Sequence, residues 1–103
     1  MVKHIVLLEF AADLSADKIE QILIELGQLV DVIPQIKNYS YGKNNSPEGL
    51  SANFNYGFTM EFKTITERDD YLQHPAHVQF ASDKIIPNLS AGINSVLVFD
   101  YSL

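Results

Sequence analysis

The chain of 103 residues contains no cysteine and no tryptophan, and only five glycines. Without cysteine, disulfide bonds, thiolate catalysis, zinc fingers and iron–sulfur ligation are excluded, so histidine, carboxylate, tyrosine and hydroxyl groups remain for chemistry. The glycines form neither a Gly-x-Gly-x-x-Gly pattern nor a phosphate loop, and no serine lies in a Gly-x-Ser-x-Gly elbow. Nucleotide cofactors and serine hydrolase chemistry are therefore disfavoured, and we expect no cofactor.

Basic residues are also few, because seven Lys and Arg stand against 13 Asp and Glu, a formal net charge of −6. They are scattered, so no basic stripe could follow the phosphates of a nucleic acid. No apolar run is longer than Ile5–Leu8, which argues against a membrane span. The length and the hydrophobic fraction of 47% indicate a single globular domain over residues 1–103.

The first residues do not resemble a secretory signal. Lys3 and His4 precede an apolar segment that Glu9 interrupts, with no small-residue cleavage site. We therefore expect a cytoplasmic protein. A chain of this size buries only about two-thirds of its unfolded surface, and its excess of apolar residues favours an oligomer.

The first half of the chain predicts a strand and then a helix. In Lys3–Phe10, aliphatic and β-branched residues occupy both odd and even positions, which is typical of a strand with two covered faces. Ser15 is a suitable N-cap for a helix that runs to about Val32, with apolar residues three and four positions apart. Pro34 ends this helix.

The second half predicts three more strands and a second helical region. Strands are expected at Tyr39–Gly42, Phe54–Phe62 and Asn94–Ser102, with an exposed loop at 43–52. A short helix is expected at Glu67–Leu72, capped by Thr64 or Thr66, and another helix begins at His74 and Pro75. The order is β-α-β-β-α-β. It predicts the α+β, ferredoxin-like fold, in which helices cover one face of a four-stranded antiparallel sheet.

The second face of that sheet would be apolar. Ile5 and Leu7 on the first strand and Leu97 and Phe99 on the last would form a patch too apolar for a solitary domain. Two copies packed face to face would bury it in a two-fold interface. We therefore expect a homodimer that joins two sheets into an α/β barrel.

The histidines are the main candidates for chemistry, and there are three: His4, His74 and His77. His74 precedes Pro75 and fits a helix cap. His77 fits either a core histidine or a functional one, and His4 needs a polar partner, which we expect from across the gap between sheet and helices. His74 and His77 alone supply too few ligands for zinc, so we expect no metal site.

Several segments together resemble the stress-responsive A/B barrel domain (Dabb) family over nearly the whole chain. They are Val2–Val6 with its Lys-His, Ile33-Pro34, Tyr39 with Gly42-Lys43, the run Tyr71–His77 that contains His-Pro-Ala-His, and Val98–Tyr101. The resemblance implies a dimeric α+β barrel. The family includes plant stress-response proteins and a plant polyketide cyclase, in which a histidine and a tyrosine act in an intramolecular aldol condensation, and these two match His77 and Tyr71.

The resemblance and the chemistry of imidazole give one candidate site. A neutral imidazole can take and return a proton near neutral pH, so His77 is the candidate general base and Tyr71 the candidate donor to an oxyanion. They can share a pocket only if the chain bends at His74-Pro75, which the restriction on a residue before proline favours. We expect the pocket to be lined by His4, Val6, Leu8, Leu23, Phe58, Met60, Val96 and Val98.

Three functions remain open at this point. The chain could be a small enzyme or ligand-binding protein with an apolar pocket, a non-catalytic dimeric stress protein whose histidines only satisfy the core, or a cofactor-free monooxygenase-like barrel. Fold alone does not decide among them. A cavity of several hundred Å³ beside His77 would favour the first.

Overall fold

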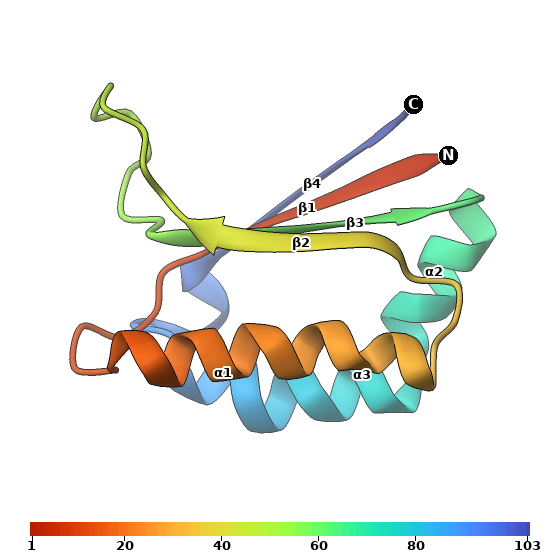
Figure 1. Ribbon diagram of the computed structural model, residues 1–103, viewed down its shortest axis with the longest axis horizontal. Coiled ribbons are helices and arrows are strands. Elements are labelled where there is room, and N and C mark those ends of the chain that lie inside the picture. Colours follow the sequence, from red (N-terminus) through yellow and green to blue (C-terminus); the bar gives the residue numbers. More distant parts are fainter.

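The computed structural model describes residues 1–103 as a four-stranded antiparallel sheet with three α-helices on one of its faces (Figure 1). The elements are β1 (Val2–Leu8), α1 (Ala16–Gly27), β2 (Lys37–Lys43), β3 (Tyr56–Phe62), α2 (Ile65–Gln73), α3 (Pro75–Phe80) and β4 (Val96–Ser102). The strand order across the sheet is β2-β3-β1-β4, and every neighbouring pair is antiparallel. The predicted ferredoxin-like fold is confirmed, with the second helical region divided into α2 and α3.

The central strand β1 separates a helix-covered face from an open one. His4, Val6 and Leu8 are buried beneath the helices, whereas Ile5 and Leu7 are half-buried on the opposite face. This alternation follows from the period of two residues in a strand. The buried side of the sheet and the inner faces of the helices together form one hydrophobic core.

The bounds of β1 and β3 are narrower than predicted. β1 ends at Leu8, and Phe10 forms an isolated antiparallel bridge with Leu89 instead of continuing the strand. β3 begins at Tyr56 rather than at Phe54, and the side chain of the preceding Asn55 accepts a hydrogen bond from the backbone N–H of Phe10, at 3.1 Å.

The other two strands also differ slightly from the prediction. β2 extends over Lys37–Lys43 rather than Tyr39–Gly42. β4 starts at Val96, because Gly92–Ser95 forms a 3-10 turn before it.

Helix α1 begins as the sequence predicts and ends earlier. The Ser15 side chain accepts a hydrogen bond from a backbone N–H of the first turn, as expected for an N-cap. The α-helix ends at Gly27, and a 3-10 turn at Gln28–Asp31 replaces its predicted last turns. The ring of Tyr39 packs against Gly27 so closely that a Cβ there would lie 2.7 Å from the ring, so only glycine fits.

The helices α2 and α3 are separated by one extended residue, His74. Of the two possible caps, Thr64 is the N-cap of α2, and its side chain accepts from the N–H of Glu67. His74 has φ −64° and ψ 131°, and Pro75 is the first residue of α3. A π-helical turn at Ala81–Ile85 continues α3 toward β4.

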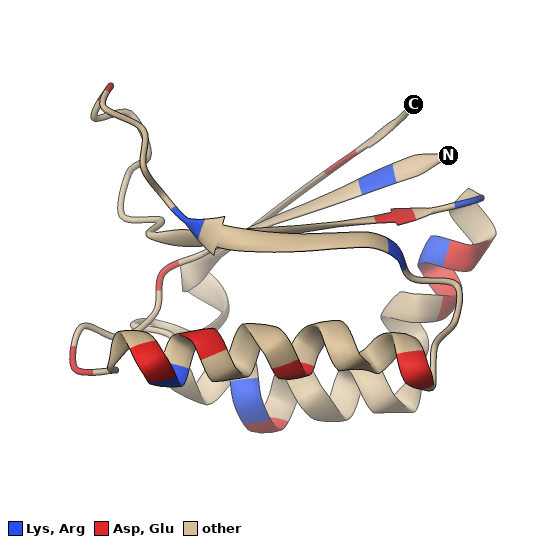
Figure 2. Ribbon diagram, in the orientation of Figure 1, with Lys and Arg blue, Asp and Glu red and all other residues tan.

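The open face of the sheet carries no helix (Figure 1). On β4, Leu97 and Phe99 are 42% and 59% exposed on this face, beside Ile5 and Leu7. Of the 13 acidic residues, α1 and α2 carry three each, and the other seven are spread over the rest of the chain (Figure 2). None of the helices has the length and apolar character that crossing a membrane requires.

Candidate functional site

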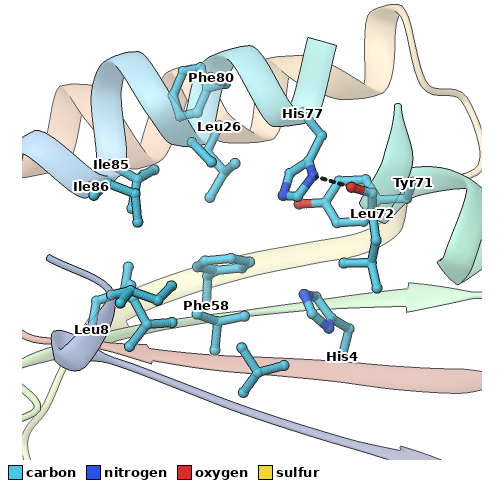
Figure 3. A pocket seen from close by; sticks show the side chains of 15 residues that line it. His4, Leu8, Leu26, Phe58, Tyr71, Leu72, His77, Phe80, Ile85 and Ile86 are labelled. Carbon is cyan, nitrogen blue, oxygen red and sulfur yellow. Dashed lines mark hydrogen bonds between the residues drawn. The ribbon is translucent and has the colours of Figure 1, made fainter. Parts of the chain in front are cut away.

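A cavity of about 350 Å³ lies between the sheet and the helices (Figure 3). Its floor comes from β1, β3 and β4, and its roof from α1, α3 and the π-helical turn. Thirteen of its 15 lining residues are hydrophobic, and the two histidines are the exceptions. The lining residues are His4, Val6, Leu8, Leu26, Phe58, Tyr71, Leu72, His77, Phe80, Ala81, Ile85, Ile86, Ile93, Val96 and Val98.

The cavity opens to solvent beside the edge strand β4. Leu72, Ile93 and Val98 line it and are 40%, 71% and 56% exposed. We call these three residues the mouth of the cavity. Because the mouth is apolar, it favours passage of an uncharged molecule over an ionic one.

The end of α2 and the start of α3 bring Tyr71 and His77 together. The expected bend at His74 is present, and the Nδ1 of His74 accepts from the N–H of Ala76 as a helix cap. The bend places the ring of His77 against that of Tyr71, with centroids 4.2 Å apart.

The hydrogen bond of His77 determines which nitrogen is free. Nδ1 lies 3.2 Å from the carbonyl oxygen of Leu72, which can only accept, so in the neutral ring Nδ1 carries the proton. The lone pair then lies on Nε2. Burial lowers the pKa of His77 below its ordinary value of 6.5, partly opposed by the Leu72 carbonyl, while the nearby His4 and His74 lower it further. His77 is therefore a neutral base at neutral pH.

Tyr71 is 1% exposed, but its hydroxyl has no hydrogen-bond partner within the protein. Every side-chain oxygen or nitrogen that is sealed from solvent has a hydrogen-bond partner. The hydroxyl of Tyr71 has no such partner, so it is accessible and faces the cavity. Figure 3 shows it beside the ring of His77. Burial raises the pKa of Tyr71 well above its ordinary value of 10, so the group remains a donor.

His4 has a different partner from the one expected. It does not bond across the gap to a helix; instead, its Nδ1 lies 2.8 Å from a carboxylate oxygen of Asp100, its register partner on the neighbouring strand β4. The other oxygen of Asp100 accepts from Arg68 on α2, also at 2.8 Å. The Nε2 of His4 makes no hydrogen bond within the protein and, by the same reasoning as for Tyr71, opens onto the cavity.

The residues expected to line the pocket mostly do so. His4, Val6, Leu8, Phe58, Val96 and Val98 line the cavity together with Tyr71 and His77. Leu23 and Met60 do not, because both are fully buried at 0% exposure in the packed core.

Sequence reasoning missed two groups around the cavity. The roof residues of the π-helical turn and its flanks carry no distinctive signal, since apolar residues there are typical of any core. Asp100 and Arg68 were also missed, because a single acidic residue in a strand usually faces water. Pairing His4 with the opposite residue of the adjoining strand would have found Asp100. No group of three or more His, Asp or Glu side chains is arranged to hold a metal ion.

Comparison with curated proteins gives relatives along almost the whole chain. Stress-response A/B barrel domain-containing protein HS1 from Arabidopsis thaliana is 33% identical over 100 residues, which cover 97% of this chain and 87% of the relative. Olivetolic acid cyclase from Cannabis sativa is 26% identical over 101 residues, which cover 98% and 95%.

Solved structures agree with the fold. The crystal structure of At3g17210 from Arabidopsis thaliana has a TM-score of 0.90 at 33% identity and covers 100% of this chain and 95% of that one. A dimeric ferredoxin-like protein of unknown function from Jannaschia sp. CCS1 has a TM-score of 0.85 at 25% identity, with 99% and 98% covered. The model of the family described as Stress responsive A/B Barrel Domain matches residues 2–103. The chain therefore belongs to the stress-responsive A/B barrel domain family.

Proposed function

We propose that this protein binds a small, largely apolar carbonyl compound in the cavity and transfers a proton on it. The observation that carries the proposal is the convergence of three unpartnered polar atoms in an otherwise apolar cavity. These are Nε2 of His77, the hydroxyl of Tyr71 and Nε2 of His4. Histidines that only satisfied a core would have both nitrogens paired and no cavity beside them, so this arrangement supports a ligand site over a scaffold.

The size of the cavity supports a ligand of one ring and a short chain. Ligand pockets start at about 300 Å³, and the cavity has about 350 Å³. An apolar cavity of about 150 Å³ holds benzene. A phenyl ketone such as propiophenone is therefore a suitable probe.

The polar atoms suit the removal of a proton next to a carbonyl group. Nε2 of His77 takes the proton, the C–H bond breaks, and the electron pair moves onto the carbonyl oxygen. The hydroxyl of Tyr71 donates a hydrogen bond to that oxygen and stabilises its charge. The apolar walls strengthen this interaction because they keep the local dielectric low.

The enolate can then react in two ways. It can take the proton back from His77, which leaves the compound unchanged. Alternatively, its carbon can attack a second carbonyl group of the same molecule, and the proton of His77 passes to the new alkoxide. The similarity to a protein described as olivetolic acid cyclase supports this second, ring-forming course.

We also propose that the chain forms a homodimer through the open face of the sheet. Ile5, Leu7, Leu97 and Phe99 lie together on that face, and a related structure is described as dimeric. Burial of apolar area of this kind contributes about 25 cal/mol per Å² to association.

The cytoplasmic location of the protein is still a prediction, and imaging of the tagged protein would check it.

Two valine variants test whether the cavity binds a ligand. Val98 lines the mouth and Val78 on α3 does not line the cavity, although their exposures of 56% and 53% are matched. Propiophenone titrated into ¹⁵N-labelled wild type should shift the amide signals of residues around the cavity. Val98→Trp should abolish these shifts and Val78→Trp should retain them. Absence of shifts in the wild type, or equal shifts in both variants, would favour the scaffold function.

A further inference from the structure

One polar cluster beside the cavity has no part in the proton transfer just described. It consists of His4 on β1, Asp100 on β4 and Arg68 on α2. The Nδ1 of His4 donates to one oxygen of Asp100, and Nη1 of Arg68 donates to the other, each at 2.8 Å. Both oxygens of this carboxylate are therefore engaged, one from the cavity side and one from the surface side.

The cluster is more sheltered than an ordinary surface ion pair. The side chains of His4, Asp100 and Arg68 are 4%, 17% and 20% exposed. Arg68 also donates from Nε to Asp69, at 2.8 Å, so its guanidinium group is fixed on two sides. A planar guanidinium held in this way fixes the orientation of the carboxylate that it contacts.

Helix α2 connects this cluster with the site. Arg68 and Tyr71 lie about one turn apart, and residues three apart share a helix face. Tyr71 contacts the ring of His4 edge to face, with centroids 5.9 Å apart. One face of α2 thus supplies both the hydroxyl group of the cavity and the cation that holds the carboxylate of His4.

We propose that Arg68 is a positioning residue which, through Asp100, makes His4 a hydrogen-bond acceptor for a hydroxyl group on the ligand. Because the carboxylate can only accept, the neutral ring of His4 keeps its proton on Nδ1, and Nε2 then presents a lone pair to the cavity. The carbonyl oxygen of the ligand has its donor in Tyr71. This inference rests on the proposed function. Within it, His4 selects carbonyl compounds that also carry a hydroxyl or enol group.

The tautomer of His4 tests the role of Arg68 without any ligand. Long-range ¹H–¹⁵N correlation NMR distinguishes a protonated from an unprotonated ring nitrogen. Wild type should show His4 with Nδ1 protonated and Nε2 unprotonated. Arg68→Met should give a mixture of both tautomers, because Asp100 then loses its second partner and can rotate.

Two further variants separate positioning from a general loss of structure. Arg68→Lys keeps a cation beside Asp100 but loses the planar guanidinium group, so it should restore the wild-type pattern only in part. Asp69→Asn removes the negative charge but keeps an oxygen that can accept from Nε of Arg68, so it should leave His4 unchanged. If Arg68→Met does not fold, Arg68→Gln replaces it as a neutral side chain of similar reach. An unchanged tautomer in the folded neutral variant would overturn the role assigned to Arg68.

The selection of a hydroxyl group is tested by comparing propiophenone with its three ring-hydroxylated isomers. A single added hydrogen bond is worth about 3- to 10-fold in affinity. Wild type should bind at least one isomer more tightly than propiophenone by that factor, and Arg68→Met should lose the preference while it still binds propiophenone. If propiophenone binds but no isomer is preferred, the selection is wrong and the proposed function stands. If none of the compounds binds, the proposed function fails, and the tautomer still decides the role of Arg68.

Discussion

The lowered pKa of His77 should appear as a dependence of protein stability on pH. Above pH 6.5, His77 is neutral in both the folded and the unfolded chain, so its titration leaves the free energy of unfolding unchanged. As the pH falls below 6.5, the unfolded chain binds a proton at this residue before the folded chain does. The folded state therefore loses stability from pH 6.5 down to the lowered pKa, and the loss is constant below it.

The size of this effect has a ceiling. One proton bound only by the unfolded chain changes the free energy of unfolding by about 1.4 kcal/mol per pH unit. His77 is half-buried and the cavity is open at its mouth, so solvent screening keeps the slope below that ceiling. His77→Gln removes the titrating group, while its amide can still donate to the carbonyl of Leu72.

Urea unfolding at several pH values between 5 and 8 measures the difference between wild type and His77→Gln. We expect wild type to lose more stability than the variant as the pH falls below 6.5, and the two to change in parallel above it. The NMR titration of the His77 ring should give a midpoint below 6.5 in the same samples. Parallel curves over the whole range, or a wild type that gains on the variant at acid pH, would refute the lowered pKa.

Three further variants test the site, the core and the interface. Tyr71→Phe should leave propiophenone binding within a few-fold and slow the exchange of its α-protons, because the donor to the enolate oxygen is lost; an unchanged exchange rate argues against that role. Met60→Ala should cost about 2–5 kcal/mol in urea unfolding, since Met60 is fully buried, and a cost below 1 kcal/mol would mean a looser core. Leu97→Glu should convert a dimer to a monomer in sedimentation, whereas a wild type that sediments at 11.6 kDa would contradict the dimer.

The fold was predictable because local pattern and global arrangement agree. The alternation at Phe58, Met60 and Phe62 requires a strand with one buried face, and the structure buries all three. The apolar spacing after Ser15 requires a helix. The bounds were less predictable, since the 3-10 turn at Gln28–Asp31 has no local signal that separates it from the end of α1.

The site was predictable only where a local rule applied. The restriction on His74 before Pro75 predicts the bend that brings His77 to Tyr71. The sequence predicts Leu23 in the lining of the pocket, whereas the rotation of α1 turns Leu26 toward the cavity and leaves Leu23 in the core. That rotation depends on the packing of the whole helix layer.

The electrostatic partners of the site depend on tertiary register. His4 meets Asp100 because β1 and β4 pair in a particular register, and Arg68 reaches Asp100 because α2 crosses that end of the sheet. Neither contact has a sequence spacing of its own. To predict these contacts, one must first know the strand order β2-β3-β1-β4 and then place the side chains on the paired strands.

Proton transfer by His77 on a bound carbonyl compound is tested most directly by hydrogen exchange. The α-protons of propiophenone in D₂O at pH 7.5 can be followed by ¹H NMR with wild type and with His77→Gln. We predict exchange well above the buffer rate with wild type, and a rate about 10²- to 10⁴-fold lower with His77→Gln, the range for loss of a general base. Equal exchange rates for the two proteins, or no exchange above buffer with a wild type that binds the ketone, would contradict the role of His77.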